Sequence, residues 1–201
     1  MSITTYSELK TAATNWLRRG DLSSFLDDLV TVGETRIFRE LRNKDMETSF
    51  NSTIASGTIS TPTSYIDLKF AYIDGSPTRR LKRRTNSWIY ENYPERSSSG
   101  KPSFIAREGS TFIFGPYSDS NHVVKGIYYK NIGPVSSSAH VLFTNNPDLY
   151  LYATLCAAEP FLKNDKRVAL WEAEYGRALA GARKQSEDEE ISGGGLAITA
   201  E

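Results

Sequence analysis

Residues 147–158, PDLYLYATLCAA, restrict the fold of this 201-residue chain more than any other stretch. In the last ten of these residues, the only polar side-chain groups are the Thr154 and tyrosine hydroxyls. A membrane span needs about 20 apolar residues, so the stretch is too short to cross a bilayer. It is also too apolar all round for a surface helix, which has one apolar stripe and one polar face. We therefore predict a helix covered on every side, partly by the rest of the fold and partly by copies of the same chain.

The flanking residues predict where this helix begins and what packs on it. Asn146 is a capping residue, and Pro147 suits the first helical position because the backbone N–H there needs no partner. We expect the helix to reach about residue 163 with a kink at Pro160, and a last helix to begin after Asp165. The side chains expected in the buried core of these helices are Leu149, Leu151, Tyr152, Leu155, Cys156 and Trp171.

The first 45 residues carry the signals of two more helices. Thr5 and Glu8 have the spacing of a capping box, in which side chains bond to free backbone amides at the helix start. Gly20 suits the end of the first helix. In the second, Gly33 costs about 1 kcal/mol of helix propensity relative to alanine. We expect a neighbouring helix to approach the backbone closely at Gly33.

Residues 46–144 have the pattern of strands. YIDLKFAYID alternates with period two, which predicts a half-buried strand with Ile66, Leu68, Phe70 and Tyr72 on one side. A hairpin, a further strand and a short helix capped near Thr85 are expected after it. The predicted fold is α+β. A four-helix domain is built from N- and C-terminal helix pairs (1–45 and 145–185), with an inserted antiparallel β domain (46–144) and an extended, flexible C-terminal tail (186–201).

Charge is balanced overall but clustered locally. The 24 Lys and Arg residues match 24 Asp and Glu residues, so the chain lacks the global basic character of many nucleic-acid-binding proteins. Five cations nevertheless form a basic run: Arg79, Arg80, Lys82, Arg83 and Arg84. This run fits either a solvated edge strand protected from aggregation, or a contact with DNA phosphates or an acidic surface. In a ring of identical chains it would face acidic groups, such as residues 187–190, of the next subunit.

The sequence contains no convincing catalytic, metal or cofactor motif. Gly100-Lys101 lacks the rest of a phosphate-binding loop. His122 and His140 have no partners at zinc-ligand spacing. Cys156 lies in the apolar helix and fits a buried side chain better than a nucleophile. Glu91, Glu95 and Glu108 are the carboxylates that a glycan-cleaving enzyme would need, but such pairs are common by chance. MSITTYSELK does not have the pattern of a signal peptide. We expect no enzyme activity and no cofactor.

Several segments in order resemble the head–tail adaptor (connector) proteins of tailed bacteriophages. They are MSITTYSELKTAATNWLRRGDL, FLDDLVTVGETRIFRELRNKDMET, YIDLKFAYIDGSPTRRLKRRT, KPSFIAREGSTFIFGP followed by the strand at 127–130, and NNPDLYLYATLCAAEPFLKNDKRVALWEAEYGRALA. The resemblance covers most of the chain. It implies a helical domain with an inserted β domain, a structural role, and a ring of about twelve copies.

The resemblance also implies partners and a place of action. The ring would dock on the portal protein, contact tail or nozzle proteins and help to retain packaged DNA, with non-specific DNA contact and no membrane. The protein would lie at the neck of the virion and be assembled in the bacterial cytoplasm. Family adaptors use extended C-terminal segments to grip the portal. The residues implied in that role here are Glu187, Asp188, Glu189, Glu190, Ile191, Leu196 and Ile198.

Three alternatives remain open at this point. Another tail-joint component, such as a tail terminator or tube protein, is usually dominated by β-structure, which the predicted helices disfavour. A cell-wall hydrolase would need a carboxylate pair in a cleft. A free-standing ligand-binding protein would be a stable monomer with a deep apolar pocket.

Overall fold

The computed structural model describes residues 3–96, 99–162 and 165–191. Its architecture is mixed α+β with mainly antiparallel sheets, as predicted. The helices are α1 (Tyr6–Leu17), α2 (Leu26–Glu40), α3 (Asn86–Asn92), α4 (Val141–Asn145), α5 (Pro147–Ala157) and α6 (Arg167–Ile191), with 3₁₀ turns η1 (Gly20–Phe25), η2 (Lys44–Met46) and η3 (Glu159–Phe161). The strands are β1 (Glu47–Thr53), β2 (Thr58–Ser60), β3 (Tyr65–Ile73), β4 (Arg79–Arg80), β5 (Lys82–Arg83), β6 (Ser99–Gly100), β7 (Phe104–Glu108), β8 (Thr111–Gly115), β9 (Tyr117–Ser118) and β10 (Val123–Lys130).

The chain divides into two compact units. Residues 1–46 and 132–201 form a helical unit, and residues 47–131 form a β unit that also contains α3. The sequence-based division placed residues 132–144 with the β region, whereas they belong here to the helical unit. That unit contains α4 in addition to the four helices predicted from the sequence.

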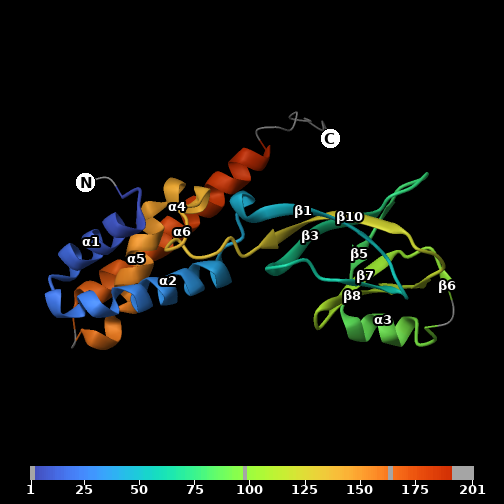
Figure 1. Ribbon diagram of the computed structural model, residues 1–201, viewed down its shortest axis with the longest axis horizontal. Coiled ribbons are helices and arrows are strands. Elements are labelled where there is room, and N and C mark those ends of the chain that lie inside the picture. Colours follow the sequence, from blue (N-terminus) through green and yellow to red (C-terminus); the bar gives the residue numbers. More distant parts are fainter. Residues whose placement is uncertain (1–2, 97–98, 163–164, 192–201) are drawn as a thin grey trace, which may run out of the picture. The chain divides into compact units, whose positions relative to one another are not determined.

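Helix α5 lies among α1, α2, α4 and α6 of its own chain (Figure 1). Leu149, Leu151, Leu155 and Cys156 are buried, and so is Trp171 of α6 in the same core. Tyr152 is half-buried and meets the Trp16 ring edge-on, with 5.9 Å between ring centroids. The chain's own helices therefore cover most of α5, so its apolar character gives no reason to expect contacts between copies.

The helix ends depart from the predictions. The first helix stops at Leu17 with Arg18 in the left-handed conformation, and Gly20 instead begins η1. Helix α5 ends at Ala157, and Pro160 lies in the separate turn η3 rather than kinking a continuous helix. Pro160 has no N–H, and it is accommodated at the start of a new turn, where none is needed.

Helix α6 is longer than expected and extends to Ile191. The acidic residues 187–190 are therefore helical, and their assignment to a flexible tail was wrong. Residues 182–191 contain neither glycine nor proline and are mostly strong helix formers, so nothing in them stops the helix.

The β unit contains two four-stranded sheets that enclose a common core. Their strand orders are β1-β10-β3-β4 and β2-β8-β7-β5, and a small parallel pair joins β6 to β9. Strands β7 and β8 form the predicted hairpin, with Gly109 at positive φ in its turn. Buried Ile73, Val124, Phe112 and Phe114 pack together between the strands. Thr85 caps α3 by accepting the Trp88 N–H, as its position predicted.

The alternation predicted for β3 was wrong beyond Leu68. In the pairing of β3 with β10, Ile127 lies opposite Phe70 and Tyr128 opposite Leu68, so the register skips Lys69. One extra residue in a strand moves every following side chain to the other face. Leu68 is therefore buried with Ala71 and Ile73, while Phe70 and Tyr72 lie on the outer face of the sheet.

Candidate interaction surfaces

The basic run crosses from one sheet to the other. Strand β4 supplies Arg79 and Arg80 at the end of the first sheet, and β5 supplies Lys82 and Arg83 at the end of the second. Leu81 lies between these strands and is buried in the core. This side chain anchors the crossing, and all five cations around it are exposed.

In the described part of the chain, most of these cations lack a carboxylate partner. Only Arg83 forms an ion pair within the described residues: it binds Asp67 and also donates to the Leu68 carbonyl oxygen. Arg79 donates to the Lys101 carbonyl oxygen at 2.9 Å. Arg80 lies over the Phe70 ring at 5.2 Å.

Arg84 lies over two rings, at 5.2 Å from Trp88 and 5.6 Å from Phe104. The sequence showed no aromatic residue inside the basic run, yet the fold brings rings from other segments beneath two of its arginines. Their charges stay exposed because an aromatic face attracts a guanidinium without neutralising it.

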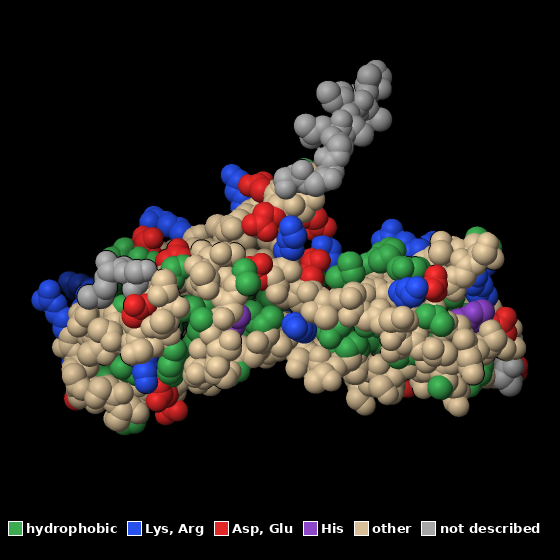
Figure 2. Space-filling model, turned by 45° about the horizontal axis from the view of Figure 1, so that its top comes forward, with side chains coloured by type: hydrophobic (Ala, Val, Ile, Leu, Met, Phe, Trp, Pro, Cys, Tyr) green, Lys and Arg blue, Asp and Glu red, His purple; other side chains and the backbone are tan. Residues whose placement is uncertain are grey.

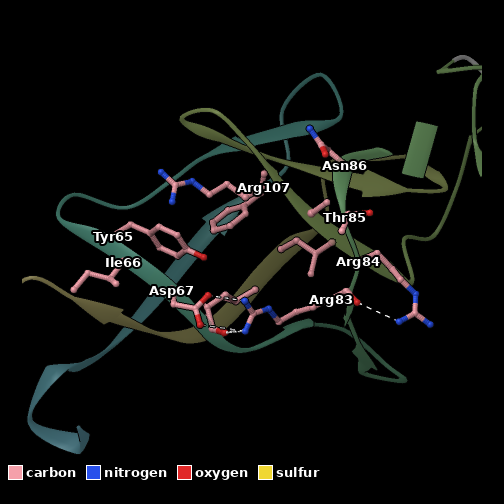
Figure 3. A pocket seen from close by; sticks show the side chains of 12 residues that line it. Tyr65, Ile66, Asp67, Arg83, Arg84, Thr85, Asn86 and Arg107 are labelled. Atoms are coloured by element: carbon pink, nitrogen blue, oxygen red, sulfur yellow. Dashed lines mark hydrogen bonds and ion pairs between the residues drawn. The ribbon is translucent and has the colours of Figure 1, made fainter. Parts of the chain in front are cut away.

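A pocket of about 330 Å³ lies next to the basic run within the β unit. Figure 3 shows the Arg83–Asp67 pair along one side and the Tyr65 ring on another. Arg107 lies over the Tyr65 ring at 5.0 Å and donates to the Gly109 carbonyl oxygen, and its guanidinium does not point into the pocket (Figure 3). Burial, and to a lesser degree Asp67, raise the pKa of Tyr65. The three arginines that line the pocket do not converge, so it lacks the geometry of an anion-binding site.

The outer sheet face, defined by Phe70, Tyr72 and Ile127, is the second surface. These side chains project from β3 and β10 on the side opposite the core. They line a hollow of about 510 Å³ together with Ser49, Asn51 and Lys125. Phe70 also lines a groove of about 320 Å³ along the basic run. The outer sheet face and the basic run are therefore continuous.

The acidic turn, residues 187–191 at the end of α6, is the third surface. Lys44 of η2 contacts this end of α6 within the helical unit. Its Nζ lies 3.8 Å from the Glu189 carboxylate, and its backbone N–H donates to Ser186 Oγ. Glu187 and Asp188 make no ion pair within the described residues. Acidic side chains are visible at this end of α6 in Figure 2. Leu196 and Ile198 lie outside the described residues.

The residues considered for catalysis have ordinary structural surroundings. His122 contacts the Asp119 carboxylate at 2.6 Å. His140 caps α4 by accepting the Phe143 N–H, and burial lowers its pKa. Glu108 accepts the Tyr90 hydroxyl at 2.9 Å, which raises the pKa of Tyr90. Glu91 and Glu95 are exposed.

Within the described residues, no group of three or more His, Cys, Asp or Glu side chains could hold a metal ion. Residues 3–96, 99–162 and 165–191 also contain no helix that is both long and apolar enough to span a bilayer.

Comparison with known proteins identifies the family. A family model described as SU10 adaptor protein matches residues 4–197. The chain belongs to the SU10 adaptor family. This is a family of phage head–tail adaptors, so the resemblance found in the sequence is confirmed. A comparison with curated proteins finds no match. As an SU10 adaptor, the chain is assigned a structural rather than enzymatic class, a place at the virion head–tail junction, and portal and tail components as partners.

Proposed function

We propose that this SU10 adaptor forms a ring beneath the portal protein, links the DNA-filled head to the tail and helps to retain the genome. The family match over residues 4–197 is the observation that carries the proposal. We take the inserted β domain and the helices around it as the adaptor architecture, and about twelve copies as the size of a ring that matches a portal. Assembly in the bacterial cytoplasm is part of the same proposal.

The segment from Glu187 onward is the proposed source of contacts with other chains. Its first part is the acidic turn of α6, which ends in Ile191. Its second part includes Leu196 and Ile198, whose apolar side chains suit a groove on the portal. The basic run is the proposed contact with an acidic surface of another subunit or with DNA phosphates.

The test is light scattering coupled to gel filtration, on the full chain with and without the portal ring of the same phage. We expect the free chain to elute at its monomer mass of 22.4 kDa, and to join the portal at about one copy per portal subunit. A chain that stays monomeric and ignores the portal would overturn the adaptor role.

Two truncations locate the portal contact. Removing residues 192–201 leaves every described residue of α6 in place, and removing 187–201 also deletes the acidic turn. We expect the shorter deletion to abolish portal binding while far-ultraviolet circular dichroism stays that of a folded protein. Undiminished portal binding by both truncations would exclude this segment from the docking mechanism.

A further inference from the structure

The zero net charge of the chain conceals two oppositely charged units. Residues 47–131 contain eleven Lys and Arg against seven Asp and Glu, which gives the β unit a net charge of +4. The remaining residues contain thirteen against seventeen, which gives the helical unit a net charge of −4. Opposite charges on two parts of one chain favour association in which unlike parts of two copies meet.

On the β unit, the basic run lies beside the exposed apolar side chains of the outer sheet face. Ile127 of β10 is 37% exposed on the outer sheet face, beside strand β3, which carries both Phe70 and Tyr72. Arg80 stacks on Phe70, and its charge has no carboxylate partner in the described part of the chain. Lys82 and Arg84 continue the groove that Phe70 lines. An apolar centre with cations along one side is therefore open on the β unit.

The acidic turn presents the matching arrangement. Glu187, Asp188 and Ile191 lie three and four residues apart, so they share one face of α6. Ile191 is 62% exposed, so its apolar side chain is open to contact with another surface. Lys184 lies one turn earlier on the same face, which still has two carboxylates against one ammonium. An apolar side chain flanked by carboxylates is thus available on the helical unit.

We propose that the outer sheet face and the basic run of one copy bind the acidic turn of a second copy. Ile191 packs on Ile127 and Phe70, while Glu187 and Asp188 face Arg80 and Lys82. The contact joins two different surfaces, so repeating it produces a ring when the rotation closes. The biological role of this contact depends on the proposed adaptor function. In this arrangement, residues after Ile191 bind the portal.

DNA is the competing occupant of the basic run. Phosphates would satisfy the cations, but they offer nothing to bury Ile127 or Tyr72 next to them. A second copy satisfies both the charged and the apolar parts of the surface. The structure therefore favours the protein partner.

Cysteine cross-linking in trans tests the contact without a portal. A chain carrying I127C is mixed with a chain carrying I191C, at high concentration and low salt, under mild oxidation. Cys156 is retained because it is buried. We expect a cross-linked dimer in several-fold excess over the control mixture of S110C and I191C, since Ser110 is exposed at the distant β7–β8 turn. Yields equal to the control would overturn the proposal.

Charge reversal supplies the second arm. Adding R80E and K82E to the I127C chain should abolish cross-linking to I191C, and adding E187K and D188K to the I191C chain should restore it. Loss of duplex DNA binding by R80E/K82E with unchanged cross-linking would assign the run to DNA instead. An internal cross-link in the I127C/I191C double variant, without dimer, would also overturn the proposal. Because none of these steps uses the portal, their failure is distinct from failure of the adaptor role.

Discussion

Gly33 of α2 lies directly against the backbone of Ala153 in α5. A Cβ atom at Gly33 would come within 3.0 Å of the Ala153 carbonyl carbon and 3.1 Å of the Thr154 nitrogen. This confirms the prediction that a neighbouring helix approaches the chain there. The absence of a side chain lets two helices of the core meet backbone to backbone.

The variant Gly33→Ala should lower the free energy of unfolding. Forcing the helices apart costs typically 1–3 kcal/mol, which exceeds the gain in helix propensity of about 1 kcal/mol. Urea denaturation followed by circular dichroism measures the difference. Gly176→Ala on α6 is the matched control, because nothing lies within 4 Å of a Cβ there and the same change should stabilise the protein. Equal stabilisation by both variants would show that the α2–α5 approach is not tight.

Cys156 should resist alkylation in the native protein. Burial, and secondly the Glu172 carboxylate, raise the pKa of its thiol to about 12. At pH 8 the reactive thiolate is then a fraction of about 10⁻⁴ of the thiol. Mass spectrometry after iodoacetamide treatment should show no adduct in buffer and one adduct in urea. An S110C variant should acquire one adduct quickly in buffer and a second only in urea, and rapid native labelling of Cys156 would contradict its burial.

Glu34 should make the folded state less stable as pH rises. Its buried carboxyl accepts the Val135 N–H at 2.7 Å, and burial raises its pKa. Above the unfolded pKa, the unfolded chain loses this proton more readily than the folded chain, so stability is lost as pH increases through the folded pKa. Each pH unit in that interval is worth about 1.4 kcal/mol.

Glu34→Gln removes the titration and keeps an oxygen that can accept the same N–H. The variant should therefore gain stability relative to the natural chain between pH 4 and pH 7. Thermal unfolding at several pH values measures this gain. A pH profile identical in the two proteins would mean that Glu34 ionises as easily folded as unfolded.

Truncating Leu68 should cost much more stability than truncating Phe70, although simple alternation puts the two side chains on the same face. Leu68→Ala removes a buried side chain and should cost about 2–4 kcal/mol. Phe70→Ala changes the outer sheet face and should cost about 1 kcal/mol or less. Urea denaturation of the two variants tests the β3 register directly. A larger loss for Phe70→Ala would place that ring in the core and remove the bulge.

Features that depend on nearby residues were predictable from the sequence. The capping box at Thr5 and Glu8, the cap at Thr85 and the β7–β8 hairpin each involve residues a few positions apart. The mixed α+β class follows from the same short-range patterns. These features were found because their physical causes lie within one turn of helix or one hairpin.

Features that depend on distant residues were not predictable. The bulge at Lys69 arises from the pairing of β3 with β10. The alternating sequence of β3 does not by itself indicate whether the strand contains a bulge. The ring beneath Arg80 comes from a strand ten residues earlier, and one of the rings beneath Arg84 comes from a strand twenty residues later. Leu81 divides the basic run between two sheets only because its side chain reaches their common core.

The opposite charges of the two units also bear on how the protein behaves as a colloid. A molecule with zero net charge is usually expected to be least soluble and indifferent to salt. A chain with +4 on one unit and −4 on the other instead behaves as a zwitterion. At low ionic strength its copies attract each other in orientations that bring units of opposite charge together. Turbidity in dilute buffer that clears on adding sodium chloride would then show electrostatic attraction between copies of the chain, in the absence of portal and tail proteins.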